Sequence, residues 1–320
     1  MLKKAQLEKL LERCMASSCD FAEIFEEEGT TESLSMLNGK LEDTNVLIRA
    51  GIGIRLYKGV QSVYGYTNET SEESLYALVD DLRGGFGIES KSVSISLVEE
   101  THENLHPIKE NPVKASLETK VALMIRASDA AKAYSDQIQK VSVGLASVCQ
   151  NVQISNSEGR LVHDTRIRCR MSVSSFAQDG QNLQSGYEAP GASKGLEFFE
   201  ERTPESIGQE ASRIALVLLE AKDCPSGKMP VIIDNGFGGV IFHEACGHAL
   251  EASSVSKNQS VFCNKLGQKV ASDKVTAIDD GTIPNAWGSQ NVDDEGNPQQ
   301  KRVLIENGIL KSYMLSLIHI

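Results

Sequence analysis

The sequence is short of basic residues relative to acidic ones, short of aromatic residues, and without a long apolar run. Lys and Arg number 32 against 44 Asp and Glu, which gives a net charge of −12 over 320 residues. An acidic chain is repelled by phosphate backbones, so nucleic-acid binding is not expected. Because no apolar run is long enough to cross a bilayer, a membrane protein is not expected either.

Cysteine is also scarce, with seven residues and no pair at CxxC spacing. An odd number without regular spacing favours reduced thiols over a disulfide framework. The N-terminus starts with basic residues, but Glu8 and Glu12 interrupt any apolar core of a signal peptide. Leu7, Leu10 and Leu11 follow helical spacing instead, which predicts an amphipathic helix. We therefore expect a soluble, cytoplasmic protein.

The densest basic stretch is RIRCR at residues 166–170. Its arginines alternate with apolar residues, and a period of two is typical of a strand. The prediction is a strand with Arg166, Arg168 and Arg170 on a solvent-exposed face, and no nucleic-acid site.

The order of helix and strand signals predicts a mixed α and β fold. Residues 20–67 predict a strand meander with a hairpin turn near Gly59, and residues 138–190 are again β-rich. Between these regions a helix is expected to begin near Thr70, which has capping-box spacing to Glu73.

Two further helices are predicted, over residues 117–134 and 203–222. The second has Thr203 as its cap and Pro204 at its first position. The stretch DCPSGKMP at 223–230 then breaks the pattern, and we place the domain boundary there.

The predicted fold class is therefore α+β. Residues 1–222 form an N-terminal α/β domain with a mixed or antiparallel sheet. Residues 229–320 begin a β-rich C-terminal domain that carries the helix of the motif described next. Near its end, Asn307-Gly308 between alternating apolar residues predicts a hairpin.

The stretch VIIDNGFGGVIFHEACGHALEA at 231–252 carries the strongest functional signal. It holds two of the six histidines, with a glutamate beside the first. Val231 to Asp234 predict a short buried strand, which a glycine turn joins to a helix that begins near Gly239.

Metal binding is one interpretation of this stretch. His243 and His248 supply imidazole ligands for zinc, and Glu244 supplies a base that takes a proton from water. A regular α-helix turns residues five apart by about 140° from one another. Convergence on one ion therefore requires a π-type turn or a helix end inside the motif, which Gly247 tolerates well.

Two other interpretations compete with it. The NGFGG turn before a helix resembles an anion-binding turn, but neither GxGxxG nor GxxxxGK[ST] fits. Alternatively, Gly236, Gly238 and Gly239 let the helix pack closely on a strand, and the histidines are ordinary core or surface residues. Spacing alone leaves packing and metal binding open.

Several pieces of the sequence, in this order, resemble the TldD branch of the TldD/PmbA family. They are GIGIRLYKG (51–59), GFGGV (236–240), HEACGHALEA (243–252), SVFCNKLGQKVAS (260–272), IDDGT (278–282), DDEGNP (293–298) and LIENGILKSYM (304–314). The histidine element within its glycine-rich surroundings is the most specific of them.

The resemblance implies a zinc metallopeptidase that degrades unfolded peptides or trims precursor peptides. By position, His243 and His248 would bind Zn²⁺ and Glu244 would be the general base. The family commonly forms a two-subunit assembly that encloses the active site. The expected partner is a PmbA-like subunit, which lacks the histidines, or a second copy in a homodimer.

The chain departs from the family after Met314, where LSLIHI (315–320) shows no resemblance. The resemblance places the third zinc ligand, a cysteine, in a portion beyond this point, so we expect a truncated reading frame or a sequence-assembly error. Cys246, Glu251 and Cys263 are the nearby residues that could substitute as ligands.

Two alternatives to a peptidase remain at this point. One is a non-catalytic binding subunit or adaptor of a two-subunit peptidase complex. The other is a regulator that acts on DNA, in line with older descriptions of the family as modulators of DNA gyrase. The acidic charge balance argues against the second.

Overall fold

The computed structural model describes residues 1–87 and 92–314, which form two compact units. The larger one, here called the sheet unit, contains residues 1–58, 62–223 and 283–297. The smaller one, here called the motif unit, contains residues 59–61, 224–282 and the chain from residue 298. The tail 315–320, on which the expected departure from the family falls, lies outside the described residues.

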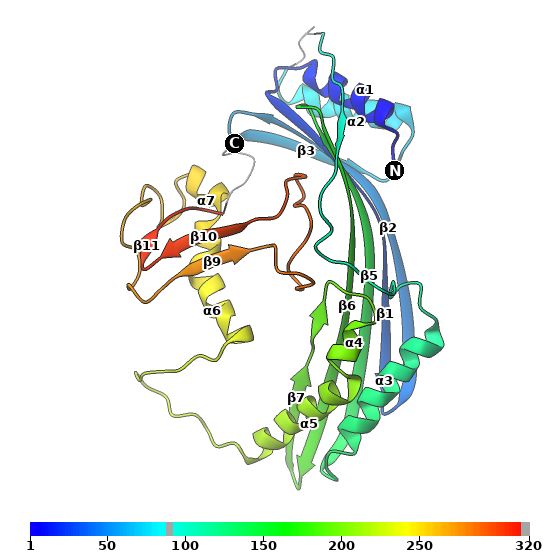
Figure 1. The fold of residues 1–320 in the computed structure, drawn as a ribbon, viewed down its shortest axis with the longest axis vertical. Coiled ribbons are helices and arrows are strands. Elements are labelled where there is room, and N and C mark those ends of the chain that lie inside the picture. Colours follow the sequence, from blue (N-terminus) through cyan, green and yellow to red (C-terminus); the bar gives the residue numbers. More distant parts are fainter. Residues whose placement is uncertain (88–91, 315–320) are drawn as a thin grey trace. The chain divides into compact units, whose positions relative to one another are not determined.

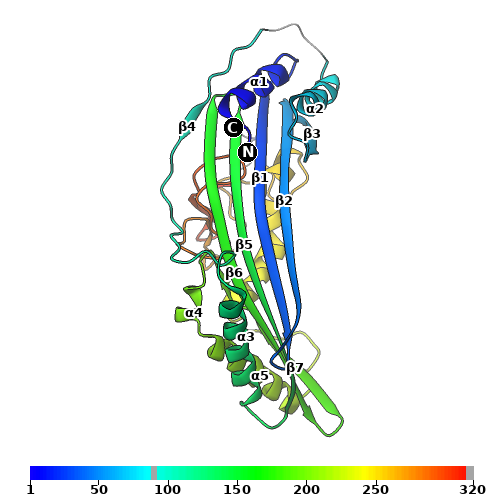
Figure 2. The same ribbon diagram turned by 90° about the vertical axis from the view of Figure 1, so that its right-hand side faces the viewer.

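The sheet unit is built on one eight-stranded sheet, whose long strands lie side by side in Figure 2. Its main path is β3-β2-β1-β5-β6-β4, and β7 and β8 also pair with β6. The pairs β1–β2, β1–β5, β5–β6 and β6–β7 are antiparallel, whereas β4 is parallel to β6. The strands are β1 (Phe21–Leu37), β2 (Lys40–Lys58), β3 (Gln61–Thr67), β4 (Val98–Glu100), β5 (Ile138–Asn156), β6 (Arg160–Asp179), β7 (Asn182–Glu188) and β8 (Gly191–Ala192).

The predicted meander is confirmed, because β1, β2 and β3 follow one another through short turns. Asn38 and Gly39 both have positive φ, as a two-residue hairpin turn requires, and Gly59 has a φ of +57° between β2 and β3. The predicted α+β class is confirmed with them.

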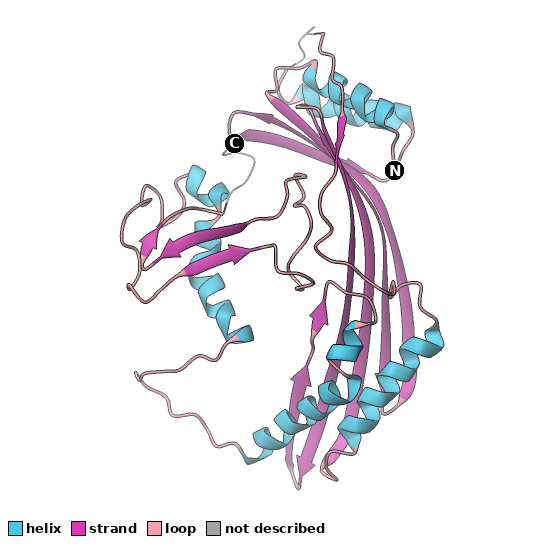
Figure 3. Ribbon diagram, in the orientation of Figure 1, coloured by secondary structure: helices cyan, strands magenta, loops and turns pink. Residues whose placement is uncertain are grey.

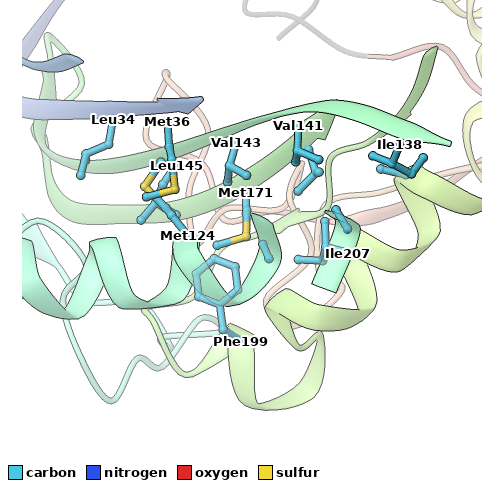
Figure 4. Packing of buried hydrophobic residues seen from close by; sticks show 14 of the residues in the cluster. Leu34, Met36, Met124, Ile138, Val141, Val143, Leu145, Met171, Phe199 and Ile207 are labelled. Atoms are coloured by element: carbon cyan, nitrogen blue, oxygen red, sulfur yellow. The ribbon is translucent and has the colours of Figure 1, made fainter. Parts of the chain in front are cut away.

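Helices pack on one face of this sheet (Figure 3). α3 contacts β5 and β6, and α5 contacts β6 and β7, whereas α1 contacts β1 and α2 contacts β2. Figure 4 shows the core beneath α3 and α5, where Met124 of α3, Ile207 of α5 and Phe199 of α4 meet apolar side chains of the strands. The helices are α1 (Lys4–Met15), α2 (Glu72–Gly84), α3 (Leu117–Lys132), α4 (Phe198–Glu201) and α5 (Pro204–Glu220).

The starts of these helices test the capping predictions. The Thr203 side chain accepts a hydrogen bond from the Ser206 amide, and Pro204 opens α5 as predicted. Thr70 does not cap α2, so that prediction was wrong. Ser71 is the cap, because its hydroxyl accepts from the Ser74 amide. No helix in residues 1–87 or 92–314 is long and apolar enough to span a bilayer.

The RIRCR stretch lies in β6, as predicted, but its arginines do not share an exposed face. The Arg166 side chain is only 7% exposed. Its guanidinium donates to Asp294 Oδ1 at 2.7 Å and to the Val292 carbonyl at 3.2 Å. Residues 283–297, distant in sequence, belong to the sheet unit and cover this arginine.

The motif unit has a small three-stranded sheet of order β11-β10-β9, with an apolar core around Leu250, Leu304 and Leu310. Asn307 (φ +48°) and Gly308 (φ +80°) form the predicted hairpin turn between β10 and β11. The strands are β9 (Ala277–Asp280), β10 (Lys301–Glu306) and β11 (Ile309–Leu310), and the short helices α6 (Val240–Phe242) and α7 (Ala252–Ser256) belong to the same unit.

The predicted buried strand at Val231 to Asp234 was wrong. These residues form no strand, and Val231 and Ile232 are 72% and 101% exposed. A strand needs a neighbour that satisfies its backbone N–H and C=O groups. No strand in the described part of the chain pairs with this segment.

A buried ion pair joins α3 to β1 and generates a stability prediction. Lys120 is 1% exposed, and its ammonium pairs with the Glu32 carboxylate. Glu32→Ala leaves that buried charge uncompensated, so we expect it to lower the free energy of unfolding by about 3 kcal/mol. Combining it with Lys120→Met removes the charge and should recover most of the loss. Urea denaturation of the three proteins measures both effects, and a single variant as stable as the parent would contradict the prediction.

Candidate metal centre

The histidine motif lies in the helical run that contains α6 (Figure 1). The type of helical turn changes along this run. A 3₁₀ turn at Gly236–Gly239 leads into α6, which is followed by a π-helical turn at His243–Gly247 and a 3₁₀ turn at His248–Leu250. The amide of His248 donates to the carbonyl oxygen of His243, five residues earlier. The predicted helix is present, therefore, but it is not a regular α-helix.

This wide turn brings the two histidines to the same side of the helix, although they are five residues apart. A π turn has more residues per turn than an α-helix, so residues five apart come close to one line. The ring centroids of His243 and His248 are 4.4 Å apart, with their planes inclined by 65°. The wide turn that convergence on one ion requires is present.

The structure brings all three sequence-predicted site residues together. One donor atom from each of His243, Glu244 and His248 lies within 4.8 Å of the other two. All three side chains are exposed, so water has access to them. Two imidazoles are donors that Zn²⁺ commonly accepts, the Glu244 carboxylate lies beside them, and the exposure leaves room for further ligands. The residues present therefore fit a zinc ion.

Gly247 makes the approach of the two rings feasible. A Cβ atom at this position would stand 3.1 Å from His243 Nδ1, closer than ordinary van der Waals contact. A larger residue would force the His243 ring to move. The glycine thus leaves space for the His243 ring in this position.

Glu251 orients the His248 ring. Its Oε1 lies 2.8 Å from His248 Nδ1, and this hydrogen bond is the main reason why the pKa of His248 is raised above its usual value. A carboxylate in this position favours a proton on Nδ1 and leaves the lone pair on Nε2, as in many histidine ligands of metals. His248 Nε2 lies 4.0 Å from Glu244 Oε2.

The three substitute ligands considered from the sequence behave differently from one another. Glu251 hydrogen-bonds to His248, which is a candidate ligand. The i,i+3 spacing places the two side chains on the same face of the helix. Cys246 packs against the apolar core of the motif unit. The Cys263 thiol lies 3.5 Å from the Val255 carbonyl oxygen. Within the described residues neither cysteine joins the donor group.

Comparison with family models covers most of the chain. Residues 22–84 match the model of PmbA/TldA metallopeptidase domain 1, residues 110–219 that of the central domain, and residues 226–319 that of the C-terminal domain. The three matches follow one another in chain order.

Curated relatives agree with these models. A metalloprotease TldD homolog of Buchnera aphidicola is 33% identical over 95% of this chain and 64% of its own length. A metalloprotease of Methanocaldococcus jannaschii is 36% identical over 99% of this chain and 69% of its own length. This chain thus spans about two thirds of the length of these relatives.

Solved structures share the fold. A protein of Thermotoga maritima described as a modulator of a DNA gyrase superposes with a TM-score of 0.77 at 24% identity, over 93% of this chain and 67% of that one. TldE of Thermococcus kodakarensis gives a TM-score of 0.72 at 18% identity, over 96% of this chain and 69% of that one. The family resemblance of the sequence is confirmed: the chain belongs to the PmbA/TldD metallopeptidase family.

Proposed function

We propose that this protein is a zinc-dependent peptidase that hydrolyses unfolded or precursor peptides. The observation that carries the proposal is the π turn, which gathers His243, Glu244 and His248 within 4.8 Å. The curated relatives are named metalloproteases, which agrees with it. In this proposal residues 1–222 are an N-terminal domain, and residues 229–320 begin the domain that bears the metal.

The residues of the site have separate roles. His243 and His248 hold the ion, with His248 offering Nε2 because Glu251 engages its Nδ1. When bound, zinc polarises the scissile carbonyl and lowers the pKa of water. Glu244 is the base, and its 66% exposed side chain is open to water. It takes the proton of the attacking water and delivers it to the leaving amine.

The same proposal includes a class of substrate and a partner subunit. An extended peptide that is held through its main chain needs few side-chain contacts, which suits cleavage of unfolded chains with little sequence preference. The proposed assembly contains a PmbA-like subunit or a second copy, and one solved relative in fold is a TldE protein. We place this peptidase in the cytoplasm.

Replacing the base tests the mechanism. Glu244→Gln keeps the shape of the side chain but cannot take a proton, so we expect turnover to fall at least about a hundredfold. Zinc content should stay the same. The measurements are cleavage of a quenched fluorescent unfolded peptide and metal analysis of the purified protein. Glu306→Gln, at an exposed glutamate of the same unit, is the control. Undiminished turnover in Glu244→Gln would refute the assigned base.

Crowding the histidine rings tests the metal centre without an activity assay. Gly247→Ala places a methyl group 3.1 Å from His243 Nδ1, so we expect zinc affinity to fall by about tenfold or more. Gly239→Ala is the matched control, because nothing lies within 4 Å of the added Cβ and its φ is −63°. Competition with a chromophoric chelator measures both affinities. Equal affinities would contradict the placement of zinc beside His243, and a folded protein that binds no zinc would favour the adaptor alternative.

A further inference from the structure

A small polar cavity lies between β6 and the segment 283–297, within the sheet unit. Its volume is about 10 Å³, which is room for a single occupant of the size of a water molecule. β6 contributes Asp164, Arg166 and Arg168 to the lining of this cavity. Ser289 and His106, which lies in the chain between β4 and α3, line it as well. The cavity is separate from the candidate metal centre, whose donor group shares none of these residues.

Four buried side-chain atoms of this lining have no hydrogen-bond partner in the described part of the chain. They are His106 Nε2, Asp164 Oδ2, Arg166 Nε and Arg168 Nε. Arg166 Nε and Asp164 Oδ2 are 3.6 Å apart, which is too long for a hydrogen bond between them. An unpaired buried polar group is costly, so such atoms normally have a water molecule or an ion as a partner. Four of them around one cavity indicate that it holds an occupant.

Three of the four atoms are hydrogen-bond donors. The Nε of each arginine always carries a hydrogen. The Asn285 amide donates to His106 Nδ1 at 2.9 Å, so Nδ1 carries the lone pair and the hydrogen of the ring is on Nε2. A water molecule has two lone pairs and would leave one of the three donors unpaired. An anion accepts from all three.

The charges around the cavity also favour an anion. Arg166 lies 2.7 Å from Asp294 and 3.6 Å from Asp164, so carboxylates compensate its charge. Arg168 forms no ion pair within the described residues, and its guanidinium lies 5.8 Å from the centroid of the Trp287 ring. Burial, with a smaller contribution from neighbouring Arg166, lowers the pKa of Arg168. The charge of Arg168 therefore lacks the partner that a half-buried cation normally has.

We propose that this cavity binds one halide ion, which is chloride in ordinary buffers, through the N–H groups of His106, Arg166 and Arg168. A phosphate, sulfate or carboxylate group is too large for a cavity of this volume, whereas a halide is little larger than water. The ion stabilises the packing of segment 283–297 on β6, because His106 is hydrogen-bonded to Asn285 of that segment. This site does not depend on zinc or on peptidase activity.

Bromide diffraction tests the identity of the occupant. Bromide replaces chloride at halide sites and scatters anomalously at its absorption edge. In crystals of the unaltered chain grown in sodium bromide, we expect an anomalous peak in the cavity, within hydrogen-bonding distance of His106 Nε2, Arg166 Nε and Arg168 Nε. A water molecule at this position, with no anomalous peak, overturns the proposal.

The dependence of stability on chloride tests the site in solution. A ligand that binds only the folded chain stabilises it, so we expect sodium chloride to raise the melting temperature by about 3 °C over sodium gluconate of equal ionic strength. Arg168→Met removes one donor and the unpaired charge and should abolish most of this difference. Differential scanning calorimetry measures it.

Arg170→Met is the matched control for Arg168→Met. Arg170 lies on the same strand and at the same distance of 5.8 Å from the Trp287 ring, but it does not line the cavity. This variant should keep the chloride dependence of the parent. A parent that is indifferent to chloride, or an Arg168→Met variant that responds like the parent, overturns the proposal. The bromide experiment uses the unaltered chain, so it decides the proposal even if Arg168→Met does not fold.

Discussion

The hydrogen bond from the His248 amide to the His243 carbonyl is the interaction on which the candidate metal centre depends. It closes a turn of five residues and brings the two imidazoles to the same side of the helix. Gly247 leaves room for the His243 ring, and Glu251 holds the His248 ring by its Nδ1. A local irregularity of the backbone, without help from distant segments, therefore assembles the donor group.

Buried charged side chains in the sheet unit restrict how its segments pack against one another. Lys120 pairs with Glu32 where α3 meets β1, and Arg166 pairs with Asp294 where residues 283–297 meet β6. Burying a charge without its partner is costly, so shifted dockings of these segments are disfavoured more strongly than apolar contacts alone would achieve. The apolar core beneath α3 and α5 stabilises the packing of the helices on the sheet. The two ion pairs favour one position of each docked segment over shifted positions.

Short-range features of the chain were predictable because they depend on neighbouring residues. The N-terminal helix buries Leu7, Leu10 and Leu11 as its periodicity indicates. The Thr203 cap and the Asn307-Gly308 turn depend on local hydrogen bonds and on allowed φ values. The need for a wide turn in the motif also followed from helix geometry alone. The error at Thr70 is of one residue, between two adjacent residues with similar capping side chains.

The sequence by itself determined the class of fold, most element positions and the identity of the candidate donors. Tertiary structure decided which of these residues are covered. Arg166 is buried because a segment more than a hundred positions away in the chain lies over it. Val231 to Asp234 has the composition of a buried strand, yet it lies exposed, and no strand among the described residues pairs with it. Burial and strand pairing depend on which distant segments come together, and the pattern of a short stretch carries no information about its partners.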